Sequence, residues 1–476
     1  MSSQNIKPKL GLVFFVAKWF EDVVLGNNTN AAVFTNALDK EESKITSKLN
    51  KDFEIIKSPF ITSMEKAHII SKDLLAKDID CLLLCFIVWA EDEYLLAFKD
   101  LMKIRPSIIW AYTPYIRAPV KSDIMTLIVN SGIVGSFISF GVLKRMEVSP
   151  ILVKGSSDEK EPYEKIIKIG KASKVLKDLK TARLGILPYR NNLMIVTYVD
   201  EFRLYSQIGP VVDYISVLQF KKAAEIITDP EVSKYVKDIK KKFIIDSRIT
   251  DKNLYNSARA SLGMEKIIMD KDFDGFALND LNTELHEVIG LRPCLYSEKF
   301  ASSKRVVGSE GDLGCVTAMY ILQKLTGKPV MFTEIFNYDI IDKIVVAGHA
   351  GPSNYLLAGD YDKITITPDY ELMDTTSELS GVWMQFVGKP GRVTLLNLIC
   401  TTDNFQFTVL TGMSLGGEIR LEGYPHYNIK IDPGIGEFIN TIYKNGISHH
   451  WAIVNADIKD ELCYLADMLK VEKVFF

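Results

Sequence analysis

Residues 307–335 read VGSEGDLGCVTAMYILQKLTGKPVMFTEI, and this stretch decides the fold. A glycine-rich turn holds Glu310 directly before a helix predicted over Asp312–Leu325, and a glycine and a proline end that helix. The apolar strand Val330–Phe332 follows and leads to Glu334. A turn, a helix and a buried strand in this order are typical of an α/β domain, in which ligands bind where strands end.

The same alternation runs through the first third of the chain. Strands that are apolar throughout and separated by helices indicate a parallel sheet that is covered on both faces. We therefore predict a doubly wound α/β domain over residues 1–180. Its predicted strands are Leu10–Val16, Phe53–Ile56, Cys81–Val88 and Ser107–Ala111, and its predicted helices are 31–49, Met64–Ala76 and Glu91–Lys103.

A second α/β unit follows the charged helix that is predicted over Ser156–Thr181. We predict a central doubly wound domain over residues 181–340, which carries both Glu310 and Glu334. Besides the opening stretch, its predicted strands are Arg183–Leu187, Ile215–Leu218 and Gly275–Leu278, and its predicted helices are Glu231–Lys242 and 251–269.

Beyond about residue 343 the pattern changes to short apolar runs broken by Gly, Pro, Asp and Asn. Strands at this spacing without helices between them suggest an antiparallel sheet or barrel. We predict a C-terminal antiparallel β-barrel domain over residues 341–476, with a helix at Ile458–Leu469. The predicted strands are Lys363–Thr367, Gly381–Val387, Arg392–Leu398, Phe405–Leu410, Glu418–Leu421 and Tyr427–Ile431.

The composition narrows the class of protein. The 476 residues include 47% apolar and 25% charged residues, with a formal net charge of −3, so nothing favours nucleic acid or an anionic membrane as a partner. None of the six cysteines is in a CxxC pair, which argues against a thiolate zinc site and fits a reducing compartment. The run Leu10–Val16 is too short for a membrane span, and we expect a cytoplasmic protein.

Two carboxylates and two histidine motifs are the candidates for chemistry. Glu310 and Glu334 follow a turn and a strand, His349 lies in the turn Gly348–Gly351, and the pair His449 and His450 precedes an apolar run. In a strand the two paired rings point to opposite faces, so only one of them would serve a given site. Mixed carboxylate and imidazole ligands suit Mn²⁺ or a similar divalent ion.

Each candidate also has a purely structural interpretation. Glu310 or Asp312 can simply favour the start of a helix electrostatically, and Glu334 can be a surface charge at a strand end. His349 can be a hydrogen-bonded turn residue, and His449 and His450 can be edge positions. The four positions span about 140 residues without a local ligand motif, so spacing alone does not bring them together.

At these residues the chain resembles the L-arabinose isomerase and L-fucose isomerase superfamily. The shared motifs are Glu310-Gly311-Asp312 before a helix, Phe332-Thr333-Glu334 at a strand end, Ala347-Gly348-His349, and the second histidine of a C-terminal His-His pair, His450. They cover residues 300–350 and the last 30. Arabinose isomerases have Gly-Ser-Gln after the opening strand, whereas this chain has Ala17-Lys18-Trp19. The resemblance therefore does not identify which sugar is the substrate.

The resemblance implies a metal-dependent aldose–ketose isomerase. It implies that Glu310, Glu334, His349 and His450 bind Mn²⁺, or Co²⁺ or Mg²⁺, and that the two glutamates also transfer protons through an enediol intermediate. A homo-oligomer, a hexamer in this family, is implied as well, with each pocket completed by a neighbouring subunit. A metal-assisted hydrolase or lyase on the same ligands, and a sugar-binding or regulatory paralogue without activity, are the alternatives.

Several polar residues near predicted strand ends are weaker candidates for contacts with a small sugar. They are Tyr189, Arg190, Asn279, Asp280, Arg292 and His449. For these residues a structural role is the stronger interpretation.

Overall fold

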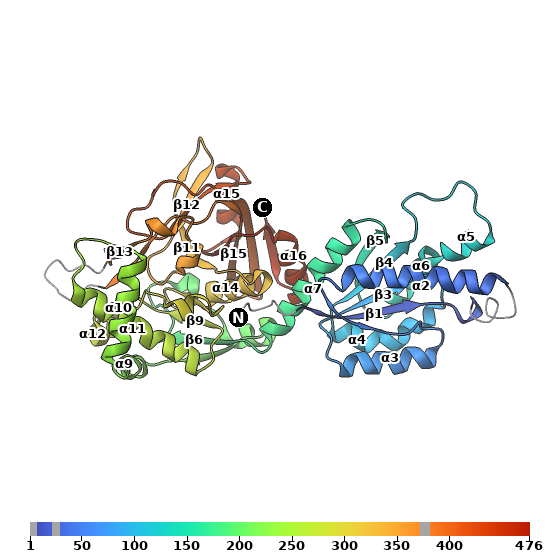
Figure 1. Cartoon of the computed structure of the whole chain (residues 1–476), viewed down its shortest axis with the longest axis horizontal. Coiled ribbons are helices and arrows are strands. Elements are labelled where there is room, and N and C mark those ends of the chain that lie inside the picture. The colour runs from blue at the N-terminus through green and yellow to red at the C-terminus, as the bar shows by residue number, and fades with distance from the viewer. Residues whose placement is uncertain (1–6, 21–28, 372–380) are drawn as a thin grey trace. The chain divides into compact units, whose positions relative to one another are not determined.

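A computed structural model describes residues 7–20, 29–371 and 381–476. The chain forms two compact units, Met1–Lys177 and Asp178–Phe476, which we call unit 1 and unit 2. In both units apolar strands form sheets whose buried side chains make the cores (Figure 1).

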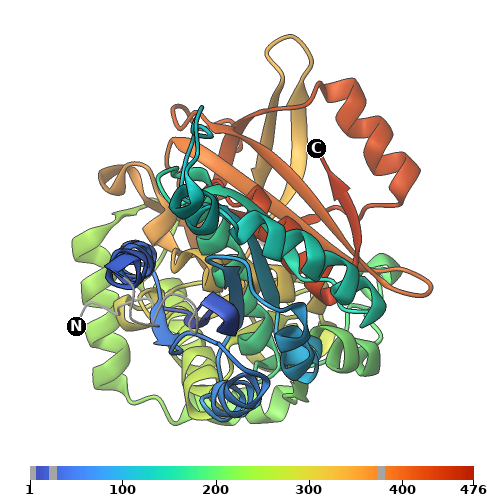
Figure 2. The ribbon, with the colours of Figure 1, turned by 90° about the vertical axis from the view of Figure 1, so that its right-hand side faces the viewer.

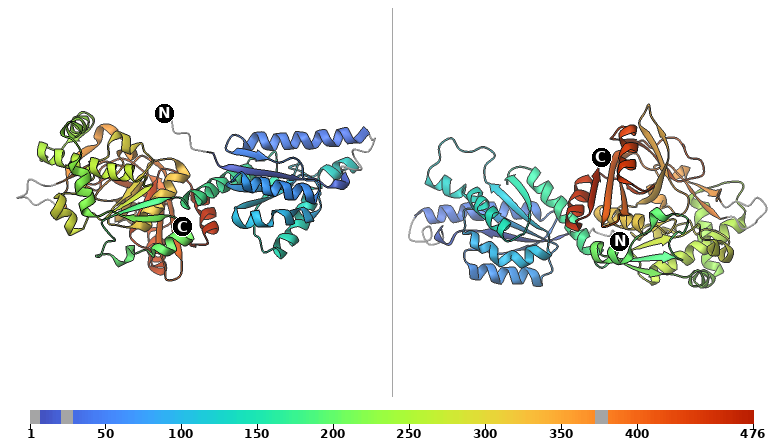
Figure 3. Two further views of the ribbon diagram at one scale, coloured as in Figure 1. Left: turned by 90° about the horizontal axis from the view of Figure 1, so that it is seen from below. Right: turned by 180° about the vertical axis from the view of Figure 1, so that it is seen from behind.

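Unit 1 contains a five-stranded parallel sheet in the order β2-β1-β3-β4-β5. Helices lie on both faces of this sheet (Figure 3), and every residue of β3 is buried. The parallel α/β prediction is therefore confirmed here. The strands are β1 (Lys9–Phe15), β2 (Glu54–Lys57), β3 (Cys81–Phe86), β4 (Ser107–Thr113) and β5 (Ile151–Ser156); the main helices are α2 (Thr29–Leu49), α3 (Met64–Ala76), α6 (Gly132–Arg145) and α7 (Glu161–Leu179), which continues into unit 2.

One helical stretch among the described residues, Ile124–Arg145, is long and apolar enough to cross a membrane by length and composition. It consists of α5 (Ile124–Val129) and α6, and core helices of soluble proteins meet the same test. The small residues of α6 pack tightly on β3, since a Cβ on Gly132 would lie 2.3 Å from the carbonyl oxygen of Phe86. This helix therefore covers the sheet with its glycine and serine face.

Unit 2 opens with a second parallel sheet, in the order β10-β9-β6-β7. Long amphipathic helices pack against it because their apolar sides need a partner surface. This confirms a second parallel α/β region. The strands are β6 (Arg183–Leu187), β7 (Val211–Tyr214), β9 (Gly275–Leu278) and β10 (Val306–Gly308); the main helices are α9 (Val217–Glu225), α10 (Asp229–Lys242), α11 (Asp251–Asp270) and α14 (Leu313–Thr326).

Unit 2 also contains a seven-stranded mixed sheet, mostly antiparallel, in the order β15-β18-β11-β12-β17-β16-β19. An extra pairing of β15 with β16 joins two of its strands again; the barrel and the domain boundary at residue 340 stay predictions. The β11–β12 hairpin extends beyond the sheet (Figure 2). The strands are β11 (Met331–Asp339), β12 (Ile344–Gly348), β15 (Gly391–Cys400), β16 (Phe405–Ser414), β17 (His426–Ile431), β18 (His450–Val454) and β19 (Glu472–Phe475), with α15 (Ile435–Asn445) and α16 (Lys459–Leu469) beside them.

Two predicted strands are wrong. Residues 215–218 contain the start of α9, because Ser216 and Gln219 form a reciprocal capping box that begins a helix. Residues 418–421 form an irregular loop, which follows Gly416 and Gly417 in left-handed conformations. The C-terminal region also contains α15, a helix that the sequence analysis did not predict.

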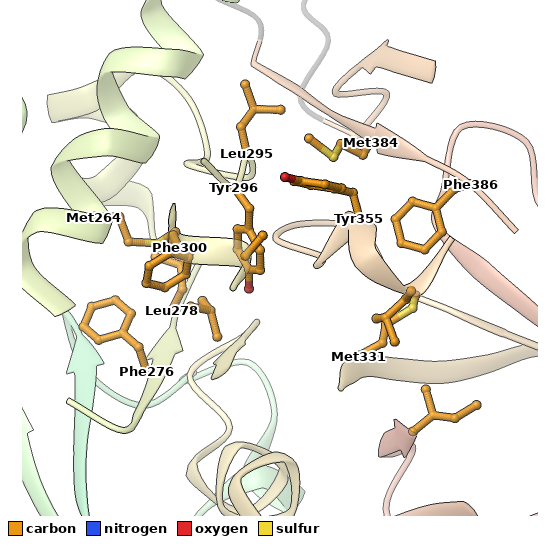
Figure 4. Packing of buried hydrophobic residues seen from close by; sticks show 14 of the residues in the cluster. Met264, Phe276, Leu278, Leu295, Tyr296, Phe300, Met331, Tyr355, Met384 and Phe386 are labelled. Carbon is orange, nitrogen blue, oxygen red and sulfur yellow. The ribbon is translucent and has the colours of Figure 1, made fainter. Parts of the chain in front are cut away.

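The core of unit 2 joins the helices to the sheets. Met264 of α11 and Phe276 of β9 lie in the same buried cluster as Met331 of β11 (Figure 4). The cluster extends to β14 (Val382–Gln385), which pairs with β13 (Thr365–Pro368) in a small separate sheet with β8 (Ile244–Ile245). The end of β10 and the start of β11 are thereby fixed relative to each other.

Candidate metal centre

Strand register brings three of the predicted ligands together. Glu334 on β11 lies opposite His450 on one neighbouring strand, β18, and opposite Gly348 on the other, β12. His349 follows Gly348 directly, at the end of β12. Residues opposite each other in an antiparallel pair have side chains on the same face, so Glu334 and His450 share a face, and His349 lies at the same end of the sheet.

Glu310 reaches the same place from the parallel sheet. It follows β10 in a tight turn in which Glu310 and Gly311 both have left-handed backbones, with φ values of 58° and 65°. Asp312 then caps α14 by accepting the backbone N–H of Cys315 at 2.9 Å. A Cβ on Gly311 would lie 3.2 Å from the backbone of Tyr189, so glycine suits this crowded, left-handed position.

The ligand atoms of these residues converge. Glu310 Oε1 lies 3.6 Å from His349 Nε2, and Glu310 Oε2 lies 3.2 Å from His450 Nε2. One ligand atom from each of these three residues lies within 4.8 Å of the others, and the same holds for the group Glu334, His449 and His450. The two groups share His450.

The position of His449 corrects one expectation. The rings of His449 and His450 lie side by side with centroids 3.9 Å apart, and do not point to opposite faces. His449 lies at a bend before β18 begins, so the alternation of side chains along a strand does not apply to it.

The facing polar atoms of the first group have no hydrogen-bond partner among the described residues. They are Glu310 Oε2, His349 Nε2 and His450 Nε2, which are buried and not aligned for hydrogen bonds with one another. The other ring nitrogens are held: His450 Nδ1 lies 2.8 Å from Asp312 Oδ2, and His349 Nδ1 lies 2.5 Å from the carbonyl oxygen of Ala350. Metal-binding histidines show this pattern, since an outer partner at one nitrogen orients the other toward the ion. The residues present therefore fit a divalent cation.

The chain is similar to known sugar isomerases over most of its length. It is 22% identical over 418 residues to the sulfoquinovose isomerases of Priestia aryabhattai and of Priestia megaterium, covering 87% of this chain and 89% of each relative. It is also 22% identical over 303 residues to the L-arabinose isomerase of Clostridium beijerinckii, covering 62% of this chain and 60% of that protein. These similarities support a distant relationship to the arabinose/fucose isomerase-like superfamily. No protein-family model matches it.

Similarity to solved structures adds nothing to this assignment. A periplasmic solute-binding protein of Actinobacillus succinogenes with bound D-allose is 11% identical, with 68% of this chain and 85% of that chain covered and a TM-score of 0.17. A periplasmic sugar-binding protein of Legionella pneumophila is 13% identical, with 67% and 94% covered and a TM-score of 0.16. Such TM-scores do not establish a shared fold.

The glutamate and histidine side chains of the candidate metal centre stabilise each other's charged forms. Burial disfavours the Glu310 carboxylate, but the imidazoles of His349 and His450 outweigh burial and hold its pKa well below the usual range. Burial likewise opposes protonation of His450, yet Asp312 and Glu310 raise its pKa to about 9. Burial raises the pKa of Glu334. A cation placed between these groups would take over the charge balance that the protonated imidazoles supply.

The weaker candidates occupy different surroundings. Asn279 is buried and donates to the carbonyl oxygens of Tyr189 and Arg190, which positions their loop. Arg190 is exposed and lies over the ring of Tyr198, at 4.2 Å from its centroid. A cavity of about 290 Å³ is lined by Tyr189, Arg190 and Gly311, beside the Glu310 turn. Contacts of this loop with a sugar stay a prediction.

Arg292 and Asp280 are the remaining candidates from the sequence, and both are fully buried. Arg292 forms ion pairs with Asp280 and with Asp369, a residue that the sequence does not indicate. The sequence indicates Asp312 only as a charge at a helix start and does not reveal its contact with His450. The motif Glu310-Gly311-Asp312 held that signal, whereas nothing local in the sequence pointed to Asp369.

The other histidines lie outside this group. His68 is in α3 and His286 is in α12 (Thr283–Ile289). His426 begins β17 and accepts the backbone N–H of Arg420 through Nε2 at 3.0 Å.

Proposed function

We propose that the chain is a divalent-metal-dependent aldose–ketose isomerase. One observation carries this proposal: Glu310, His349 and His450 bring unpartnered buried polar atoms together, and Glu334 and His449 form a second group that shares His450. The chain is also similar to proteins named as sulfoquinovose isomerase and L-arabinose isomerase, and this similarity supports a sugar isomerase activity.

In this proposal Glu310, Glu334, His349 and His450 hold the ion, with Mn²⁺ as first choice and Co²⁺ or Mg²⁺ as alternatives, because the ligand set mixes oxygen and nitrogen. When bound, such an ion polarises the sugar carbonyl and offsets the negative charge of an enediolate. His449 lies close enough to the same centre to contact a sugar hydroxyl.

The glutamates carry the proton transfers. Isomerisation moves a hydrogen between C1 and C2 of the sugar, so one carboxylate removes the proton and returns it to the neighbouring carbon. The other carboxylate assists the exchange of the hydroxyl proton. The burial of Glu310 and the partial burial of Glu334 limit the loss of the transferred proton to water.

The test compares Glu310→Gln and Glu334→Gln with the wild type on aldoses that include sulfoquinovose and L-arabinose, the sugars named for the relatives. We expect ketose formation to fall by about 10²–10⁴-fold in both variants, because each loses a proton-transfer group. Glu42→Gln is the matched control, since Glu42 is a buried glutamate of unit 1 that pairs with Lys57. Normal isomerisation by either site variant would refute the assignment.

The same assay separates the alternatives. A ketose with the mass of the aldose indicates isomerisation, whereas a metal-assisted hydrolase or lyase would release fragments. Sugar binding without turnover in the metal-loaded wild type would indicate an inactive paralogue.

We further infer a cytoplasmic homo-oligomer with three domains, 1–180, 181–340 and a barrel over 341–476. The support is the superfamily resemblance together with the two parallel sheets and the mixed sheet. The mass of the native assembly in solution tests whether the chain forms a homo-oligomer.

A further inference from the structure

A buried network of charges lies directly behind the Glu310 turn. Asp280, Arg292 and Asp369 are each no more than 1% exposed, which is rare for charged side chains unless they are paired. Asp280 follows β9, Arg292 follows α12, and Asp369 follows β13, so the network joins three separate segments of unit 2. A cluster this deeply buried has a cost in desolvation, and its place beside a candidate ligand calls for an explanation.

Asp280 connects this network to Glu310. Its Oδ1 accepts the backbone N–H of Glu310 at 2.7 Å, and its Oδ2 lies 3.5 Å from Nη1 of Arg292. The hydrogen bond matters because Glu310 has a left-handed backbone, which costs roughly 1–2 kcal/mol for a residue with a side chain. Asp280 thus stabilises the strained conformation that aims the Glu310 carboxylate toward His349 and His450.

Arg292 holds Asp280 and is itself held. Its Nε donates to Asp369 Oδ2 at 2.7 Å, its Nη2 donates to the other oxygen of Asp369, and its Nη1 donates to Glu371 at 2.8 Å. The guanidinium also lies over the ring of Trp383, 4.8 Å from the centroid. With 1% of its side chain exposed and its donors committed, Arg292 is an anchor and not a sugar contact.

We propose that Asp280, fixed by Arg292, is a positioning residue that sets the orientation of Glu310. This inference rests on the proposed function, because it takes Glu310 as a metal ligand. Asp280 acts through the backbone of Glu310, so it tunes how well the carboxylate meets the ion without touching the sugar. Substituting an outer partner of a metal ligand typically lowers metal affinity or activity by about 10–100-fold.

The experiment measures Mn²⁺ binding and turnover in Asp280→Ala, Asp280→Asn and Arg292→Lys. Asp280→Ala removes the acceptor for the Glu310 N–H, so we expect Mn²⁺ affinity and kcat to fall by about 10–100-fold. Asp280→Asn keeps an oxygen for that N–H but loses the charge and the oxygen that faces Arg292, so we expect it to recover at least half of this loss on a logarithmic scale. Arg292→Lys, which keeps the charge and loses the planar fork, is expected to fall between them.

The matched control lies at the other end of the same strand. Asp274 precedes β9 and accepts the backbone N–H of Arg183 at 3.1 Å, so Asp274→Ala loses a similar hydrogen bond far from Glu310 along the strand. Its Mn²⁺ affinity should match the wild type. Melting temperatures and far-UV circular dichroism of all variants show which of them fold.

The outcomes separate the two proposals. Wild-type Mn²⁺ affinity in folded Asp280→Ala would refute the positioning role while leaving the isomerase intact, and so would equal losses in Asp280→Asn and Asp280→Ala. A wild type that binds Mn²⁺ but isomerises no aldose would refute the function, and the affinity series would still test Asp280. A wild type that binds no Mn²⁺, Co²⁺ or Mg²⁺ would refute both.

Discussion

The carboxylate of Asp312 serves two partners, and replacing it separates stability from metal binding. Oδ1 accepts the N–H of Cys315 and so caps α14, whereas Oδ2 holds Nδ1 of His450. Asp312→Asn retains one oxygen for these two N–H donors. If the amide oxygen stays at the cap, the amide NH₂ faces Nδ1 and favours the tautomer with a proton on Nε2, which cannot bind a metal ion.

The structure sets the expected magnitudes. Asp312→Ala loses the cap and should lower the free energy of unfolding by about 1 kcal/mol, whereas Asp312→Asn should lower it by less. Both variants lose the partner that orients His450, so Mn²⁺ affinity should fall by about 10–100-fold. Expressed as free energy, that is about 1.4–2.7 kcal/mol of binding.

The assay is urea unfolding of the metal-free protein together with Mn²⁺ titration followed by calorimetry. The decisive comparison is Asp312→Asn, in which a small change in stability should accompany a large change in affinity. If Asp312→Asn binds Mn²⁺ as tightly as the wild type, then Asp312 does not orient His450 and the geometry assigned to the centre is wrong.

Two further predictions concern stability. Burial raises the pKa of Glu265 from 4.5 to about 7, so between these pH values the folded protein keeps a proton that the unfolded chain releases, and stability falls as pH rises. Glu265→Gln should therefore raise the free energy of unfolding by about 3 kcal/mol at pH 8 and by little at pH 4, as measured by urea unfolding at both pH values; an equal effect at both would contradict the assignment. Mn²⁺ at 100 times its Kd should stabilise the wild type by about 2.7 kcal/mol over protein in EDTA, and a melting temperature that rises equally in His450→Ala would place the ion elsewhere.

Strand periodicity accounts for what the sequence predicts of the fold. Runs such as Cys81–Phe86 are buried throughout, and their continuous apolar character predicts strands of a covered parallel sheet. The strand predicted at residues 215–218 is wrong because four apolar or small residues fit a strand as well as a helix start. The capping pair Ser216 and Gln219 makes this segment the start of a helix. The missed helix α15 has apolar residues at helical spacing and ends at the left-handed Gly446.

The sequence indicates the candidate ligands of the site but not the residues that hold them in place. Glu310, Glu334, His349 and His450 follow strand ends or turns, where polar residues are conspicuous in sequence, and their motifs carry a family resemblance. The side chains that hold Glu310 and His450 are distant in sequence, as Asp312 is from His450 by 138 residues. Such contacts arise only when the sheets pack, so sequence spacing does not reveal them.

Helix α14 explains how two sheets build one centre. It packs against β9 and β10 of the parallel sheet and also against β15 and β18 of the mixed sheet, and nearly all of its residues are buried. Its N-terminus therefore has a fixed position relative to both sheets, and Asp312 at that end contacts His450 at the start of β18. Asp280 fixes the turn on the parallel side and Asp312 fixes the histidine on the other. A large-to-small substitution in this helix should accordingly loosen Glu310 and His450 together, because the same element positions both.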